Sequence, residues 1–144
     1  MSADGMMWSA DAALSQAVLA ALRADPVVQA IYGSPARIFD DETSEPAFPY
    51  AELERHEVED RSSALTPGQS HTLTVTVRTR DDGRSAAKEA VGVLRAAFET
   101  MRLSIPGMHV VLVQPLYSDV LRTPDLRSFR GIIRVRIIVE GATP

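Results

Sequence analysis

The chain has 144 residues and contains no cysteine. This length suits one domain with its own core, and the lack of cysteine excludes disulfides, thiolate metal sites and a cysteine nucleophile. A formal net charge of −4 argues against a protein that binds nucleic acid through bulk positive charge.

The N-terminal part of the chain predicts a helix. Leu14, Val18 and Leu22 recur at every fourth position, which is typical of a helix that buries one face. The first 22 residues contain Asp4 and Asp11 but no basic residue, so we expect no secretion signal. No apolar run approaches the ~20 residues that cross a bilayer. We therefore expect a protein made in the cytosol with no membrane partner.

A second, shorter helix is predicted directly after the first. Asp25 is a favourable N-cap, Pro26 suits the first helical position, and Gly33 is a natural stop. Residues 37–39 then have the composition of a brief strand.

Two strands and a long helix follow in the middle of the chain. Residues 50–58 predict an extended strand after Phe48 and Pro49, and residues 71–78 alternate between apolar and polar side chains. Beyond that strand the spacing becomes helical. The apolar stripe of this helix is formed by Ala87, Val91, Leu94, Phe98 and Met101.

The C-terminal part predicts two more strands. The continuous apolar run at 110–113 indicates a central position in the sheet. The last strand alternates, with Ile133, Val135 and Ile137 on one face and arginines on the other. Together the segments predict one α+β domain over residues 1–144, a mostly antiparallel sheet of about four or five strands with the two main helices packed on one face.

No segment carries a recognisable catalytic motif. The sequence has no GxSxG elbow and no phosphate-cradling glycine loop. His56, His71 and His109 fall on three different predicted strands without metal-ligand spacing, so we expect surface or rim histidines. The acidic run at 40–45 reads as a solvated loop rather than a cation site. We expect no catalytic residue, no metal ligand and no cofactor.

Two irregular stretches, 61–69 and 118–128, are longer than simple chain reversal needs. Their arginines suit contacts with a protein partner, because arginine is enriched at such interfaces. The alternative is a solvated face balanced by carboxylates. The candidate interface residues in and beside these stretches are Arg61, Pro67, Gln69, Arg122, Asp125, Arg127 and Arg130.

The order of segments resembles a known family. AALSQAVLAALRADPVVQAIYG precedes RIFDD and FPYAEL, then comes HTLTVTVRTRDDGRSAAKEAVGVLRAAF, and FRGIIRVRIIVEG closes the chain. This pattern is similar to the small tail terminator or tail-completion proteins of phages, prophages and phage-derived gene transfer agents. The pieces most specific to it are 48–50, the strand–Gly83–helix junction and Arg130-Gly131.

The resemblance implies a structural role in the virion. Such proteins form a ring, usually hexameric, at the head-proximal end of the tail. The ring docks on the last ring of tail tube protein, stops tube growth and offers a surface to the head-tail connector or stopper protein. DNA passes through its channel only as cargo. Two other classes stay open: a cytosolic α+β ligand-binding or regulatory module without catalytic activity, and a small metal-assisted hydrolase.

Overall fold

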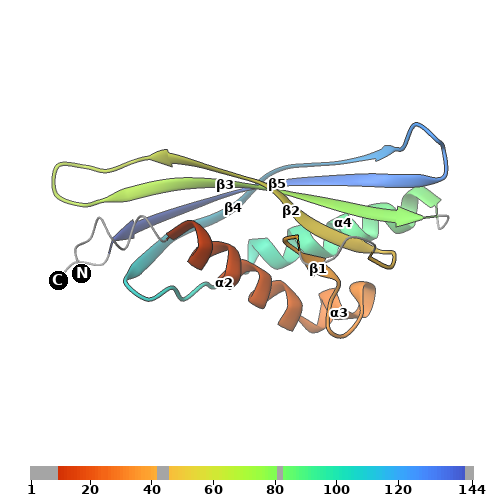
Figure 1. Ribbon diagram of the computed structural model, residues 1–144, viewed down its shortest axis with the longest axis horizontal. Helices are drawn as coiled ribbons and strands as arrows, with labels where there is room; N and C mark the ends of the chain where they lie inside the picture. The colour runs from red at the N-terminus through yellow and green to blue at the C-terminus, as the bar shows by residue number, and fades with distance from the viewer. Residues whose placement is uncertain (1–9, 42–45, 81–82, 142–144) are drawn as a thin grey trace.

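A computed structural model describes residues 10–41, 46–80 and 83–141. In this part of the chain, three helices cover one face of a five-stranded sheet and leave the other face open (Figure 1). The predicted α+β class and the helices on one face are thereby confirmed. In chain order the elements are α2 (Ala10–Ala24), α3 (Pro26–Tyr32), β1 (Ile38–Phe39), β2 (Tyr50–Asp60), β3 (Gly68–Arg80), α4 (Gly83–Glu99), β4 (Met108–Arg122) and β5 (Ser128–Gly141).

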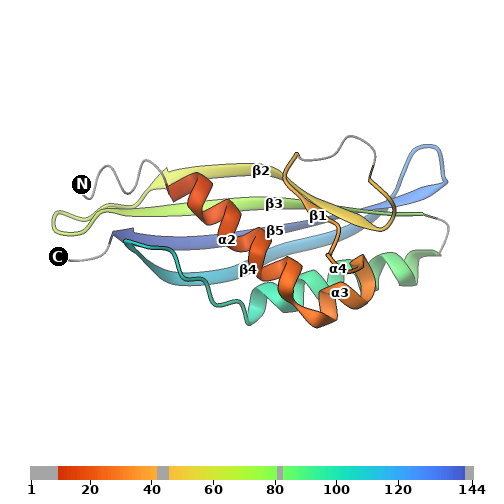
Figure 2. The same cartoon turned by 60° about the horizontal axis from the view of Figure 1, so that its bottom comes forward.

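The sheet is antiparallel except at one edge, with the order β1-β2-β3-β5-β4. The short β1 pairs in parallel with β2, and the other neighbours run antiparallel. The ladder between β3 and β5 runs in continuous register from Gly68 opposite Glu140 to Arg80 opposite Ser128. Two hairpins extend the sheet at opposite ends of its long axis, β2–β3 at one end and β4–β5 at the other (Figures 1 and 2).

The predicted start and end of the second helix are confirmed. The Asp25 carboxylate accepts a hydrogen bond from the Val27 backbone N–H at 2.8 Å, and Pro26 occupies the first helical position. The helix stops at Gly33, whose φ of 93° favours glycine. The Tyr32 hydroxyl then donates to the Ala90 carbonyl at 2.7 Å, which fixes α3 against α4.

The predicted apolar faces meet in one core. The stripe of α2 and the Leu94–Phe98 side of α4 are buried against the alternating apolar side chains of β3 and β5. On β5, each buried residue is followed by a more exposed one, which gives that strand its period of two. On the central strand β3 the alternation is interrupted, because Ser70, His71 and Thr76 are also buried. The fully buried members from the predicted sets are Leu14, Val18, Leu22, Leu73, Val75, Leu94, Phe98, Ile133, Val135 and Ile137.

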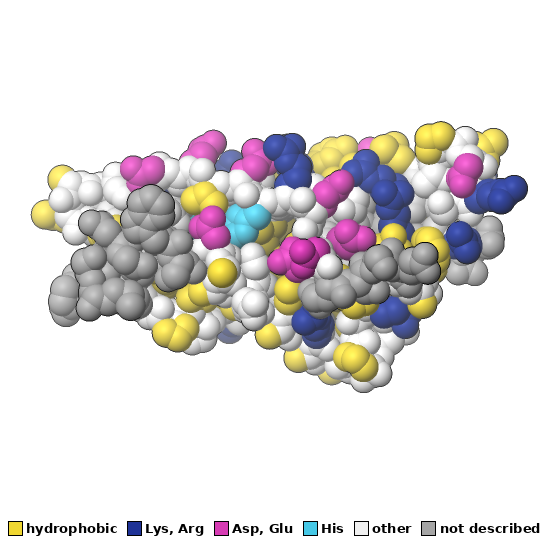
Figure 3. All heavy atoms as spheres, in the orientation of Figure 1, with side chains coloured by type: hydrophobic (Ala, Val, Ile, Leu, Met, Phe, Trp, Pro, Cys, Tyr) yellow, Lys and Arg dark blue, Asp and Glu magenta, His cyan; other side chains and the backbone are white. Residues whose placement is uncertain are grey.

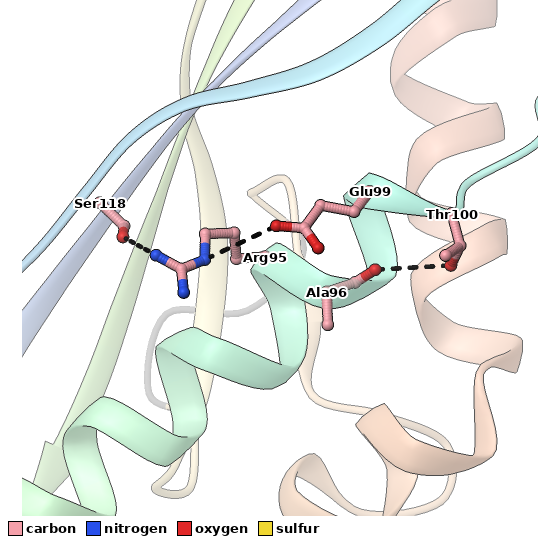
Figure 4. A network of polar contacts seen from close by, with 5 residues as sticks. All are labelled: Arg95, Ala96, Glu99, Thr100 and Ser118. Carbon is pink, nitrogen blue, oxygen red and sulfur yellow. Dashed lines mark hydrogen bonds and ion pairs between the residues drawn. The ribbon is translucent and has the colours of Figure 1, made fainter.

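Polar contacts add a second connection between α4 and β4. Arg95 donates from Nη1 to the Ser118 hydroxyl at 3.1 Å, and its Nε lies 4.0 Å from a Glu99 carboxylate oxygen (Figure 4). One turn further along, the Thr100 hydroxyl bonds to the Ala96 carbonyl at 3.4 Å. These groups are exposed, so the ion pair adds well under ~1 kcal/mol and the packing of α4 on the sheet depends on its apolar face.

The predicted central position of the strand at 110–113 is wrong, because β4 forms an edge of the sheet. A register shift between Val110 and Leu112 interrupts the ladder with β5. Val111 at this shift is 49% exposed, whereas Val110 and Val113 pack against the core. A β-bulge turns the extra side chain out of the alternation, so the apolar run does not mean burial on both faces.

Both irregular stretches are shorter than predicted. Residues 68 and 69 already belong to β3, so the β2–β3 connection spans 61–67. Residues 118–122 belong to β4, with Ser118 opposite Ile133 and Arg122 opposite Phe129, which leaves 123–127 as the β4–β5 connection. Gly68, Ser118 and Asp119 are residue types that favour turns, and this explains why these strand ends were predicted as loops. None of the helices in the described ranges is long and apolar enough to cross a membrane.

Gly131 lies where α4 packs closely on the sheet. We therefore expect a side chain at this position to lower the stability of the fold. A Cβ at Gly131 would lie 2.3 Å from Val91 Cγ2 and 3.2 Å from Val77 Cβ. Gly131→Val should therefore destabilise the fold by at least ~1–3 kcal/mol, the range for overpacking. Gly92 on α4 is the matched control, because a Cβ there has no atom within 4 Å. Gly92→Ala should stabilise by up to ~1 kcal/mol. Denaturant unfolding measures the free energy of unfolding of both variants. Equal changes in the two variants would contradict the close packing of α4 on Gly131.

Candidate assembly interface

The β2–β3 hairpin ends in an ordered tip with an exposed apolar residue. The Arg61 N–H donates to the Gly68 carbonyl at 2.8 Å, and the Ser63 N–H donates to the Thr66 carbonyl at 2.9 Å. Beyond these bonds Leu65 is 93% exposed. A large apolar side chain held out on a structured turn is the type of group that anchors protein contacts.

Of the three candidate residues near this tip, only Arg61 is exposed. The Pro67 carbonyl accepts the Gly141 N–H at 2.9 Å and so ties the hairpin to the end of β5. The Gln69 side-chain oxygen lies 3.0 Å from His71 Nε2. Pro67 and Gln69 therefore make contacts inside the domain, whereas Arg61 is exposed to solvent.

The β4–β5 hairpin carries three candidate residues at the opposite end. Asp125 accepts hydrogen bonds from the Thr123 hydroxyl and from the Arg127 N–H. These bonds, the Thr123 bond most strongly, lower the pKa of Asp125 below its ordinary value. Leu126 is 68% exposed with a φ of 62°, and the Arg122 guanidinium lies 4.9 Å from the Phe129 ring centre. This tip is thus also structured and exposed.

Arg130 lies on the open face of the sheet and not at a hairpin tip. Its Nη2 contacts a Glu54 carboxylate oxygen at 3.1 Å, and the Thr76 hydroxyl bonds to the same oxygen at 3.0 Å. Arg134 approaches Glu57 at 3.9 Å in the same way. Two of the three arginines of β5, Arg130 and Arg134, are therefore paired with carboxylates of β2. Figure 3 shows that other Lys and Arg side chains gather toward the end with the β4–β5 hairpin.

Sequence reasoning missed an exposed apolar strip along the β4 edge. The strip is formed by Val111, Leu116, Tyr117 and Leu121, each between 42% and 51% exposed. A second register shift lies between Pro115 and Tyr117. An unpaired edge is a template for pairing, and bulges and proline limit that pairing. Pro115 was the available signal, because proline inside a strand favours an edge.

A cavity of about 490 Å³ opens between α3, α4 and the start of β2. Phe48, Pro49, Thr79 and Arg80 contribute to its lining. The Arg80 guanidinium lies 4.5 Å from the Phe48 ring centre. The Thr79 hydroxyl is buried and has no hydrogen-bond partner within the described ranges. β3 begins next to the β2–β3 tip and ends at Arg80, which lines the cavity. The cavity and the tip therefore lie at opposite ends of this strand.

The prediction of surface or rim histidines is wrong for His71. His71 is fully buried, His56 is partly buried, and their nearest ring nitrogens are 2.7 Å apart. Burial lowers the pKa of both rings, for His71 to about 4 with a further contribution from His56. His109 is exposed on β4, as expected. The antiparallel register of β2 and β3 brings the pair together, and no local spacing signals it.

Comparison with known proteins identifies the family. The family model described as "Tail completion protein gp17" matches residues 16–140. A chain of a solved structure, the "Virion of native gene transfer agent (GTA) particle", is 27% identical with a TM-score of 0.79. The match covers 89% of this chain and 95% of that chain. Comparison with curated proteins found no match. The predicted resemblance is confirmed: the chain belongs to the tail completion protein gp17 family and is a virion-associated structural protein of phage-type tails.

Proposed function

We propose that this chain forms a hexameric ring that caps the tail tube, terminates its growth and joins the tail to the head-side connector or stopper protein. DNA passes through the channel of the ring. The observation that carries this proposal is the family match over residues 16–140 together with the similarity to a gene transfer agent virion chain. In this proposal the protein acts by contact alone, with no catalytic step and no cofactor.

The shape of the molecule supports a ring built from unlike contacts. The two hairpins lie at opposite ends of the sheet (Figure 1), so a contact that uses one end of each subunit joins it to the other end of the next. Such heterologous contacts generate a ring when the rotation closes. Arg61 and Leu65 belong to one end, and Arg122, Asp125 and Arg127 belong to the other.

We assign the subunit contact to the Leu65 tip and the cavity at the far end of β3. Leu65 supplies an exposed apolar side chain, and the cavity offers a lining that includes Ile31, Phe48 and Pro49. Burying a leucine side chain at an interface is worth about 1.5–3 kcal/mol. Arg80 at the cavity is also placed to pair with a carboxylate of the incoming hairpin, such as Asp60.

The charge of the chain suits a channel through which DNA moves. With a formal net charge of −4, the subunit gains little from releasing DNA counterions. The open face carries arginines, but Arg130 and Arg134 are engaged with Glu54 and Glu57. DNA would then slide past the ring without being held by it.

Leu65→Asp should prevent ring formation while leaving the domain intact. The side chain is 93% exposed, so its replacement should change the free energy of unfolding by no more than ~0.5 kcal/mol. Ala64→Asp is the control, because it adds the same charge at the exposed neighbouring position. The mass of particles formed by the chain, alone and on purified tail tubes, measures assembly.

Wild type and Ala64→Asp should form hexamers in at least one of these conditions, and Leu65→Asp should form none. Rings made equally well by Leu65→Asp would show that the contact lies elsewhere. A wild-type chain that stays monomeric in both conditions and leaves tube ends uncapped would contradict the ring itself.

A further inference from the structure

We propose that Asp11, His56 and His71 form a binding site for one divalent transition metal ion, with Zn²⁺ as the best fit. The three residues come from α2, β2 and β3. One ligand atom from each lies within 4.8 Å of the other two. A bound ion would clamp the beginning of α2 to the two strands beneath it. The sequence predicts no metal ligand, since the three residues lie far apart along the chain, and the fold reverses that expectation.

The two imidazoles are already close to a metal-binding arrangement. His56 Nε2 and His71 Nδ1 face each other at 2.7 Å. Zinc–nitrogen bonds of ~2.0–2.1 Å at the tetrahedral angle place two histidine nitrogens about 3.3 Å apart. The two nitrogens therefore need to separate by roughly 0.6 Å, and the rings turn so that both lone pairs point at the ion. Asp11 is exposed in the first turn of α2, so its carboxylate can turn toward the pair without disturbing the core.

The outer ring nitrogens have the partners that metal-bound histidines require. His71 Nε2 lies 3.0 Å from the Gln69 side-chain oxygen, and His56 Nδ1 lies 3.3 Å from the Ser15 hydroxyl oxygen. That hydroxyl donates its own hydrogen to the Asp11 carbonyl at 2.9 Å, so its oxygen is free to accept. Ligating histidines almost always donate their second N–H in this way, which fixes ring orientation.

The donor set selects the class of ion. Two imidazole nitrogens and one carboxylate oxygen suit Zn²⁺ and neighbouring first-row metals. Ca²⁺ and Mg²⁺ prefer oxygen ligands throughout. Three protein ligands leave a fourth position for water. His71 is buried and Asp11 is exposed. The site is therefore closed to solvent on the side of the core and open to an ion on the side of Asp11.

Calorimetric titration of the purified, untagged chain with Zn²⁺ tests the site, with Co²⁺ absorption as an independent report of the ligands. We expect one ion per chain and a higher melting temperature in its presence, because the ion binds the folded state. Asp11→Asn, an exposed substitution, should weaken binding at least ~10-fold. His56→Gln should abolish it, and Gln69→Ala should weaken it ~10-fold through the lost second contact of His71.

His109→Gln is the matched control, because His109 is exposed on β4 away from the cluster, and it should leave binding unchanged. Absence of stoichiometric binding by the wild-type chain would overturn the proposal and leave a hydrogen-bonded histidine pair. Unchanged Zn²⁺ binding by Asp11→Asn would also overturn the proposal. Because Asp11 is exposed, this variant should fold even if the core does not tolerate replacement of a histidine. Neither result bears on ring formation.

Discussion

Particles assembled with a shortened β2–β3 hairpin should carry overlong tails or tails that fail to join heads. The change replaces residues 61–67 with Asn-Gly, so that these two residues and Gly68 form a three-residue loop between the paired Asp60 and Gln69. It removes Leu65 and Arg61, the exposed groups at this tip, and it spares the core. Without this contact a ring cannot hold its neighbours, and tube growth continues. Electron microscopy of tail length and head attachment measures the effect.

The domain itself should remain folded in this variant. Residues 61–65 are exposed, and the bond from the Gly141 N–H to the Pro67 carbonyl is the main internal contact that is lost. One backbone hydrogen bond is worth about 0.5–1.5 kcal/mol. If the circular dichroism spectrum of the variant matches that of wild type, the domain is folded. A defect in tails would then result from the lost subunit contact and not from unfolding. Tails of normal length, correctly joined, would show that the assembly contact is placed wrongly.

Phe98→Ala should be strongly destabilising. Phe98 is fully buried near the end of α4, inside the cluster formed by the helices and the sheet. Replacing a buried aromatic residue by alanine loses the free energy gained by moving the ring out of water, and it leaves a cavity. The free energy of unfolding should fall by about 3–5 kcal/mol. Denaturant unfolding measures the change in free energy.

Phe48→Ala is the comparison for this truncation. Phe48 is 37% exposed beside the cavity, so the same chemical change should cost clearly less. Equal costs for the two substitutions, or a near-neutral Phe98→Ala, would mean that α4 does not pack on the sheet as described.

The fold could be predicted because its elements repeat simple patterns. β3 and β5 bury one face and expose the other, so Leu73, Val75 and Val135 alternate with polar residues. The α2 stripe recurs at helical spacing. The cap at Asp25 and the stop at Gly33 are local signals whose chemistry is complete within a few residues. Each of these features depends on near neighbours in the chain.

The features that the sequence did not predict depend on pairing between distant segments. Val111 and Pro115 lie beside register shifts in β4, which forms an edge of the sheet, and the apolar run alone reveals neither the bulge nor the edge. His56 meets His71 only because β2 and β3 pair in one particular register. The two candidate interface stretches were recognised by composition, but their position at opposite ends of the sheet follows from topology. That separation is what suits them to a head-to-tail contact.

Tail length in particles produced without this chain is the most direct measurement of its role. If the protein caps the tube and joins it to the head side, such particles should show overlong tails, or tails and filled heads that stay separate. Supplying the wild-type chain should restore joined tails of normal length. Joined tails of normal length in its complete absence would contradict the proposed function.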